Sequence, residues 1–397
     1  MKKVVLAFSG GLDTSYCAIY LAKEMGLEVH AAIANTGGFS ADELKNIEKR
    51  AIALGVKSFK NLDVTQTYYN NTIKYMVFGN MLKNSTYPLS VSAERISQAT
   101  AIAEYAKEMK ADYICHGSTG AGNDQVRFDM IFNILAPEIE VIALIRDRRL
   151  SREEEISYLR ENGVDYDFKK AEYSINQGIW GTSIGGKETL TSNQTLPDSA
   201  YPSKLTKEGS EKLTLTFVKG ELTAVNGVKY GNIAAIQKVQ EIAGAYAIGR
   251  DMHIGDTIIG IKGRVGFEAA AAMVIIKAHH MLEKHTLTKW QLFWKEQIAN
   301  FYANHLHEGQ YYDPAMRDME AMFQSSQEFV SGNVIITLYP YRFEMVGIES
   351  DHDLMSNKFG SYGEMNNSWS GDDVRGFGKI FGNQVSIYRL VNDLNKK

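Results

Sequence analysis

The sequence predicts an α/β protein in which a parallel-sheet domain over residues 1–165 is followed by an α+β domain over residues 166–372 and an arm over residues 373–397. Short, continuous apolar runs separated by helical segments indicate the parallel sheet, because strands buried on both faces have no polar side. The second domain is indicated by a change of composition after about residue 165, where Ser, Thr, Gly and Asn become frequent. A chain of 397 residues is also long for a single core.

The strands of the first domain are expected where β-favouring apolar residues run together. These runs are Val4–Phe8, Val29–Ala34, Val56–Leu62, Tyr113–Gly117 and Val141–Arg146. The spacing of apolar residues predicts helices over Asp13–Met25 and Ala41–Leu54. A capping box formed by Ser151 and Glu154 predicts a further helix over residues 152–162.

The second domain is predicted to open with a long polar loop over residues 174–210, and such loops in compact enzymes are usually functional. A β-hairpin, two helices and a stretch of strand character should follow, and they cover Leu213–Val218 with Leu222–Val225, 265–284, 288–304 and Val334–Val346. Residues 373–397 form an amphipathic tail that cannot bury its apolar face alone. His279, His280 and His285 lack the spacing of a zinc motif and are interpreted as helix-surface or interface residues, so no metal held by the protein alone is predicted.

Composition indicates an ordinary globular chain, with 44% hydrophobic and 23% charged residues. The 43 basic and 47 acidic residues give a net charge of −4, which disfavours a nucleic-acid partner but not a local anion pocket. Cys17 and Cys115 lie in apolar stretches and are expected to be buried thiols of a reducing compartment. No apolar run approaches the ~20 residues of a membrane span, and the first strand is too short for a signal peptide, so a cytoplasmic protein is predicted.

The most specific motif lies where the first strand meets the first helix, and it reads Ser9-Gly10-Gly11-Leu12-Asp13-Thr14-Ser15. Glycines let the backbone approach a ligand, the helix start offers unpaired N–H groups, and three hydroxyls add donors, which together favour a phosphate site. The alternative is a plain turn capped by Ser or Asp, but the whole string is far more specific than a glycine pair. The string is neither a Gly-Lys-Ser/Thr loop nor a Gly-x-Gly-x-x-Gly loop, so hydride transfer loses its main support.

A second polar loop follows the strand that ends near Gly117, and it reads Ser118-Thr119-Gly120-Ala121-Gly122-Asn123-Asp124-Gln125-Val126-Arg127. Its hydroxyl, amide, carboxylate and guanidinium groups suit an amino-acid zwitterion. A solvated loop is the usual fate of such residues. The position at the carboxyl end of a strand, where α/β sheets bind ligands, nevertheless favours a site.

Taken together, the two loops resemble those of the argininosuccinate synthase family in the ATP-pyrophosphatase superfamily. Further matching stretches cover nearly the whole chain, namely Ala34–Gly37, Tyr173–Asn176, Trp180–Ser183 and Arg375–Gly382. The resemblance implies a nucleotide-binding domain like that of the adenine nucleotide alpha hydrolases, an α+β synthetase domain and a C-terminal oligomerisation arm. It also implies a cytoplasmic, homotetrameric ligase of arginine biosynthesis, which joins citrulline to aspartate through citrullyl-AMP and uses ATP with Mg²⁺.

Site residues follow from the resemblance, position by position. It implies that ATP contacts Ala7, Phe8, Ser9, Gly10, Gly11, Leu12, Asp13, Thr14, Ser15, Ala34 and Gly117. It implies that citrulline contacts Tyr87, Ser92, Asn123, Arg127, Ser174 and Ser183. It implies that aspartate contacts Thr119, Asn123 and Asp124. The residues expected to act in catalysis are Asp13, Asp124 and Arg127, with Asp13 helping to hold Mg²⁺ on the phosphates.

The sequence departs from the family pattern at Ala121, where lysine is frequent, and at Gly178. Gly255 and Phe267 align near the family's Glu and Tyr that contact citrulline from the second domain, and neither residue is given that role here. One alternative function is another amidating ligase with the same phosphate loop, which should carry a glutamine-splitting domain that the sequence lacks. The other is a non-catalytic nucleotide-binding module, which would need neither the second loop nor the long second half.

Overall fold

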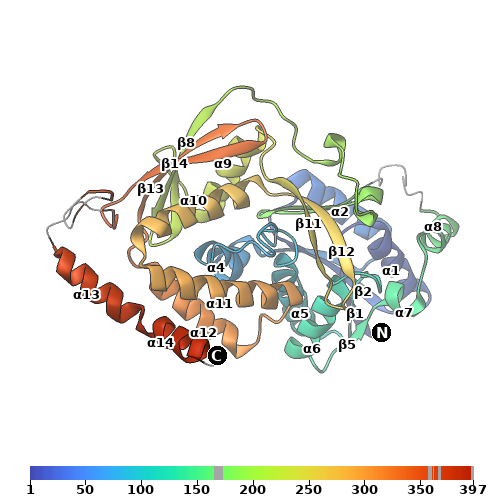
Figure 1. Ribbon diagram of the computed structural model, residues 1–397. Coiled ribbons are helices and arrows are strands. Elements are labelled where there is room, and N and C mark those ends of the chain that lie inside the picture. Colours follow the sequence, from blue (N-terminus) through green and yellow to red (C-terminus); the bar gives the residue numbers. More distant parts are fainter. Residues whose placement is uncertain (165–172, 356–359, 361, 365–367, 395–397) are drawn as a thin grey trace. The chain divides into compact units, whose positions relative to one another are not determined.

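A computed structural model describes residues 1–164, 173–355, 360, 362–364 and 368–394 (Figure 1). Two compact units are present, Met1–Asp351 and His352–Lys397. The predicted domain boundary near residue 165 falls at the edge of residues 165–172, which lie outside the described residues. Within the described ranges, no helix is long and apolar enough to cross a membrane.

The first sheet of the larger unit is parallel, with strand order β3-β2-β1-β4-β5. Its strands are β1 (Lys3–Ala7), β2 (Glu28–Asn35), β3 (Ser58–Asp63), β4 (Tyr113–Cys115) and β5 (Glu140–Ile142). The strand order reverses between β1 and β4, and ligands of open α/β sheets bind at such a point, beyond the carboxyl ends of the strands. The two predicted loops follow these two strands, so the topology brings them together.

Helices cover both faces of this sheet, as its continuous apolar strands predict. Along β1, Val4 and Leu6 pack in one buried cluster, whereas Val5 packs in the other. Helices α1 and α8 lie against the first face and α5 and α6 against the second. The helices and turns of this half are α1 (Leu12–Lys23), α2 (Ala41–Ala53), α3 (Thr65–Tyr68), η1 (Tyr69–Ile73), α4 (Lys74–Phe78), α5 (Glu94–Glu108), α6 (Asp124–Leu135), α7 (Leu144–Arg148) and α8 (Arg152–Glu161).

The rest of the described part of the larger unit contains two antiparallel sheets, four long helices and two short ones. One sheet has the order β10-β9-β8-β13-β14 and the other β11-β12-β7-β6. The strands are β6 (Ser174–Gly178), β7 (Gly181–Gly185), β8 (Glu211–Val218), β9 (Glu221–Val225), β10 (Val228–Lys229), β11 (Arg250–Asp256), β12 (Lys262–Glu268), β13 (Gly332–Tyr339) and β14 (Arg342–Glu349). The helices are η3 (Lys187–Leu190), η4 (Asp198–Ala200), α9 (Asn232–Gly244), α10 (Ala270–Thr286), α11 (Lys289–Glu308) and α12 (Pro314–Ser326).

Several predictions about local structure are wrong. The run Val141–Arg146 is strand only to Ile142, because its polar end starts α7 instead. The predicted loop 174–210 begins with the hairpin β6–β7, whose Ser and Asn side chains gave no apolar signal. The predicted helix 265–284 starts at Ala270, since residues up to Glu268 pair with β11 and β7. His279 is not on a helix surface, because it is fully buried and contacts Asn80 and Gln327.

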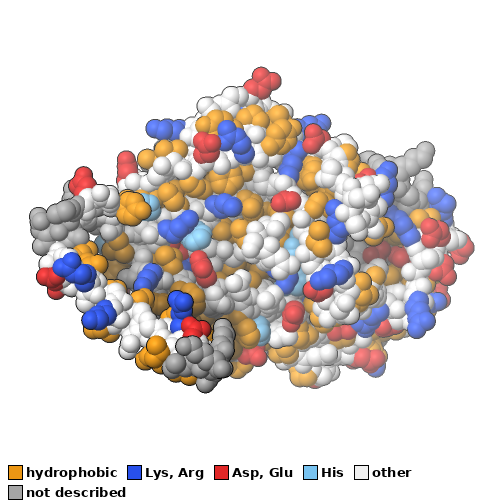
Figure 2. Space-filling view, viewed as in Figure 1, with side chains coloured by type: hydrophobic (Ala, Val, Ile, Leu, Met, Phe, Trp, Pro, Cys, Tyr) orange, Lys and Arg blue, Asp and Glu red, His pale blue; other side chains and the backbone are white. Residues whose placement is uncertain are grey.

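The smaller unit contains α13 (Gly371–Phe381) and α14 (Asn383–Leu394), and Ser370 caps α13 through a reciprocal bond with Asp373. Large apolar side chains of these helices are more than half exposed, and they include Val374, Phe377, Ile380, Phe381, Val385, Tyr388 and Leu390. On the face shown in Figure 2, acidic and basic side chains are interspersed, in keeping with a net charge of only −4. Both cysteines are buried free thiols, as predicted.

Candidate active site

The predicted site residues converge on one cavity of about 960 Å³ in the larger unit. This volume is near the upper end of the range of about 300–1,000 Å³ for ligand pockets. The phosphate loop and the second loop line one side, and strands β6, β7, β11 and β12 contribute the opposite wall. Every predicted site residue lines the cavity except Ser15, which is buried and donates its hydroxyl proton to the carbonyl of Gly11.

The first loop has the backbone that a phosphate site requires. Gly10 has a φ of +77°, a backbone conformation that residues other than glycine rarely adopt. Helix α1 begins after Gly11, and no side chain caps it, so its first amide groups lie uncapped beside the cavity. The hydroxyl groups of Ser9 and Thr14 lie 3.4 Å apart at the same place. The loop can therefore surround an anion with amide and hydroxyl donors.

Asp13 does not cap α1 but forms a carboxyl pair with Glu155 of α8, which sequence reasoning missed. Burial raises the pKa of Asp13, and burial together with the neighbouring Asp13 raises the pKa of Glu155 to about 8. Two carboxyl groups in contact are stable when they share a proton or a cation. Because Mg²⁺ prefers one or two carboxylates together with substrate phosphates, this pair beside the phosphate loop fits that ion.

The second loop is held in place by its own side chains. His116 bonds to Asp129 at 2.9 Å and accepts from the amide of Ser118, and Gln125 donates to two carbonyls of the loop. A Cβ atom on Gly117 would lie only 3.1–3.3 Å from atoms of Asp13 and Thr14. Glycine at this position therefore lets the two loops meet closely at the carboxyl ends of β1 and β4.

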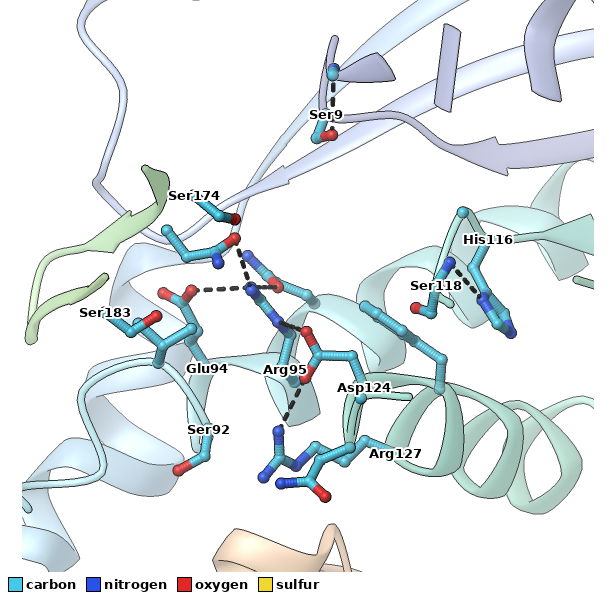
Figure 3. A pocket seen from close by; sticks show the side chains of 18 of the residues that line it. Ser9, Ser92, Glu94, Arg95, His116, Ser118, Asp124, Arg127, Ser174 and Ser183 are labelled. Atoms are coloured by element: carbon cyan, nitrogen blue, oxygen red, sulfur yellow. Dashed lines mark hydrogen bonds and ion pairs between the residues drawn. The ribbon is translucent and has the colours of Figure 1, made fainter. Parts of the chain in front are cut away.

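Arg95 of α5 lies at the centre of the cavity wall and was not predicted (Figure 3). Its guanidinium donates to Asp124 and Glu94 at 2.9 Å each, and it also reaches Gln98 and Asn176. A charged, mostly buried arginine thus joins α5, the start of α6 and strand β6. No sequence signal marked it, because residues 94–108 were not recognised as a helix facing the site.

Asp124 is held ionised between two arginines. Arg127 donates to it at 2.8 Å, while the other side of the Arg127 guanidinium bonds to the carbonyl of His307. Burial alone would raise the pKa of Asp124, but Arg95 and Arg127 outweigh it and lower that pKa to about 2. Burial raises the pKa of the adjacent Glu94 to about 6 despite its contact with Arg95. The Asp124 side chain keeps 36% exposure, so its carboxylate can still accept from a ligand.

Two glycines allow the opposite wall of the cavity to approach the first half of the chain closely. A Cβ atom on Gly38 would lie 1.9 Å from the carbonyl oxygen of Gln177 in β6. A Cβ atom on Gly178 would lie 2.0 Å from a carboxylate oxygen of Glu94. Ser174 and Ser183 of this hairpin point toward the cavity, as Figure 3 shows.

Ser92 lies at the end of the cavity away from Ser9 of the phosphate loop (Figure 3), and Tyr87 lines the same cavity. Tyr87 is buried, and its ring packs against His253 and Phe267 with centroid distances of 4.9 and 5.5 Å. The Ser92 hydroxyl is buried and has no partner within the described part of the chain. This end combines aromatic surface with polar atoms that still need partners, which suits the body of a small organic substrate.

A glycine-rich loop at a helix start and a polar second loop, both at the switch point of a parallel sheet, are the features of a nucleotide-binding α/β protein. The family described as "Arginosuccinate synthase N-terminal HUP domain" matches residues 3–165, and "Arginosuccinate synthase C-terminal domain" matches residues 173–388. The chain belongs to the argininosuccinate synthase family.

Full-length relatives agree with this assignment. The chain is 36% identical over 397 residues to an argininosuccinate synthase of Dictyoglomus turgidum, with 99% of each chain covered. It is 35% identical to that of Xanthomonas campestris, covering 98% of this chain and 99% of the relative. It is 33% identical to that of Methanocaldococcus jannaschii, covering 97% and 98%. Similarity therefore extends over both halves of the cavity.

Proposed function

We propose that the chain is an argininosuccinate synthase, which condenses citrulline with aspartate at the expense of ATP and releases AMP and pyrophosphate. One observation carries the proposal beyond family membership. The phosphate loop and the Asp124–Arg127 loop open into the same cavity, so a nucleotide and two amino acids can meet there. In this arrangement residues 1–165 bind the nucleotide, residues 166–372 complete the acceptor site, and residues 373–397 form an oligomerisation arm.

The phosphate loop would hold ATP through the amides at the start of α1 and the hydroxyls of Ser9 and Thr14. Ala34 and Gly117 would flank the nucleotide with little side-chain bulk. Asp13 would help to hold Mg²⁺, which neutralises charge on the phosphates when it is bound. Since the loop carries no strong nucleophile, it supports transfer of the nucleotide to a substrate rather than to the protein.

Citrulline would lie along Tyr87, Ser92, Ser174 and Ser183, with its ureido group toward the phosphates. Its ureido oxygen attacks the α-phosphorus, the bond to the β-phosphate oxygen breaks, and pyrophosphate leaves. The aspartate amine then attacks the activated carbon, and AMP leaves with the former ureido oxygen. Positioning and charge stabilisation supply most of such catalysis.

Thr119, Asn123 and Asp124 would bind aspartate, with the Asp124 carboxylate facing the aspartate ammonium. The amide oxygen of Asn123 accepts from the backbone of Ile258, which fixes the loop against β12 and its turn. Arg127 and Arg95 keep Asp124 ionised, so this carboxylate remains an acceptor throughout the physiological pH range.

Pyrophosphate release should require citrulline, because the loop binds the leaving group but provides no attacking atom. The measurement is pyrophosphate production with ATP alone, with citrulline, and with citrulline and aspartate. Only the last mixture should give argininosuccinate by mass spectrometry. Equal release with ATP alone would indicate a hydrolase and contradict the ligase assignment.

Binding of MgATP should release close to one proton per site at pH 7, because Mg²⁺ held by Asp13 would displace the proton that Asp13 and Glu155 share. The proton is present in the free enzyme, since the pKa of Glu155 is raised to about 8. Calorimetric titrations in two buffers of different ionisation enthalpy measure the release. It should disappear at pH 9 and in Glu155→Gln. The same release in that variant would place the proton elsewhere.

We further propose that the enzyme acts as a cytoplasmic homotetramer in which α13 and α14 bury their apolar faces against another copy. Free buried cysteines and more than half-exposed residues such as Phe377 and Phe381 support these two parts of the proposal. Removal of residues 375–397 should lower the number of subunits per particle, calculated from the molecular mass measured by light scattering. An unchanged number of subunits would exclude the arm as the assembly contact.

A further inference from the structure

The wall contributed by β11 carries a polar residue that neither the reaction nor the family resemblance assigns. His253 is 5% exposed, lines the cavity, and lies nearly parallel to the ring of Tyr87, with 4.9 Å between centroids and 22° between planes. Its Nδ1 atom is buried without a partner among the residues that the structure describes. The hydroxyl of Ser92 is also buried without a hydrogen-bond partner among the described residues. Two unpartnered buried polar atoms on the wall of one cavity indicate that a ligand completes this part of the site.

Gly255 makes room for the imidazole. It lies two residues beyond His253 on the same face of β11, and a Cβ atom there would lie 2.7 Å from Nε2 of His253. Real Cβ atoms do not approach so closely, so no other residue at position 255 leaves the ring where it is. Glycine at position 255 therefore leaves the space that the His253 ring occupies beside the cavity.

Burial and one nearby cation set the protonation of His253, and the acidic groups Glu308 and Asp256 act on that cation, Lys83. Burial, with a contribution from Lys83, lowers the pKa of His253 to about 4, so the ring is uncharged at neutral pH. Burial, Arg127 and Lys83 lower the pKa of the nearby His307 to about 3. An ammonium group placed here would meet two neutral rings and the guanidinium of Arg127, which line the same cavity, and this is an unfavourable environment for it.

The carboxylates that line the cavity have other partners. Glu94 and Asp124 are paired with Arg95, Asp256 with Lys262 at 2.6 Å, Asp13 with Glu155, and Glu43 with Ser40. Asp124 is the one assigned to the ammonium of aspartate. Within the described ranges, therefore, each carboxylate that lines the cavity already has a partner, and the one nearest along β11, Asp256, has its partner in the exposed Lys262.

We propose that the acceptor is a ureido amino acid whose α-nitrogen is acylated and uncharged, bound through its amide by His253 and Ser92 and used in preference to citrulline with a free α-ammonium. This inference rests on the proposed function and specifies its substrate. An amide offers one donor and one acceptor, which the imidazole and the hydroxyl can satisfy together. The bonds formed and broken are those already described, and the product keeps the acyl group.

The test compares kcat/KM for pyrophosphate release with citrulline and with Nα-acetylcitrulline, at saturating ATP and aspartate. The acetylated acceptor should be favoured by about ten-fold or more, the effect of leaving one buried polar group unpaired. Preference for citrulline would overturn the inference and leave the proposed function intact. Release with neither acceptor would overturn both.

Substitutions on β11 test whether His253 determines the preference between the two acceptors. His253→Leu keeps an apolar contact with Tyr87 and should lower kcat/KM for Nα-acetylcitrulline about ten-fold, with an unchanged KM for ATP. His253→Ala combined with Gly255→Glu supplies a carboxylate and should shift the preference toward citrulline. His280→Leu, a substitution outside the cavity, should change neither the kcat/KM for Nα-acetylcitrulline nor the preference between the two acceptors. If His253→Leu leaves the acceptor preference as it is, His253 has no part in selecting the substrate.

Discussion

Replacing Asp124 with asparagine should slow the use of aspartate about ten- to a hundred-fold, while citrulline-dependent adenylate formation survives. The carboxylate faces the aspartate ammonium in the proposed arrangement, and one lost charge-assisted hydrogen bond costs about 1.5–3 kcal/mol. Phosphate is an implausible partner for Asp124, because like charges repel. The two steps separate in the assay, since pyrophosphate–ATP isotope exchange with citrulline needs no aspartate.

The control for this experiment is Asp147→Asn, which removes the same charge from a carboxylate that is 55% exposed and lies outside the cavity. It should leave both the exchange and the overall reaction near their normal rates. If Asp124→Asn instead loses the exchange and keeps a normal KM for aspartate, Asp124 belongs to the nucleotide or its metal. The division of the second loop between citrulline and aspartate would then be wrong.

Replacing Arg95 with methionine should lower the free energy of unfolding by about 3–5 kcal/mol, the usual result of removing one partner from a buried ion pair. Glu94 and Asp124 would both lose their guanidinium contact, and Glu94 is only 1% exposed. Whole proteins are stable by only about 5–15 kcal/mol, so the loss is severe. Urea unfolding at one fixed protein concentration, followed by circular dichroism, measures it.

Arg342→Met is the matched control for Arg95→Met. Arg342 pairs with Glu344 at 2.7 Å, but both side chains are 57% exposed, and such pairs contribute less than about 1 kcal/mol. Similar destabilisation by the two variants would show that the Arg95 cluster adds nothing beyond an ordinary surface pair. In that case the cluster would matter for substrate binding alone.

The parallel sheet and its two ligand loops could be predicted because their signals are local. Continuous apolar strands, a glycine pair before a helix and a capping box at Ser151 each lie within a few residues of sequence. The family resemblance supplied the remaining site residues, among which Ser15 alone does not line the cavity. The hairpin β8–β9 was equally readable from its alternating side chains.

What sequence reasoning missed depends on contacts between distant segments. Arg95 carries no local signal, and its role becomes visible only when α5 lies against β6 and Arg95 donates to Asn176. Glu155 gains its raised pKa only because α8 lies beside Asp13. His253 becomes a candidate substrate-binding residue only when β11 stacks its ring against Tyr87. In each case the chemistry arises from burial and from a partner that no local pattern names.

The close approach of Gly38 to the backbone of Gln177 also bears on how the molecule is made. The two residues lie far apart in the chain, and contacts of this kind form late because a long loop must close first. The face of the first sheet that packs against α1 and α8 has a core drawn from residues 4–164 alone, so this face can fold before the hairpin β6–β7 exists. An incomplete chain would then have a phosphate loop open to water, without the wall that encloses the acceptor. The acceptor side of the cavity therefore exists only once the second half of the chain has folded onto the first.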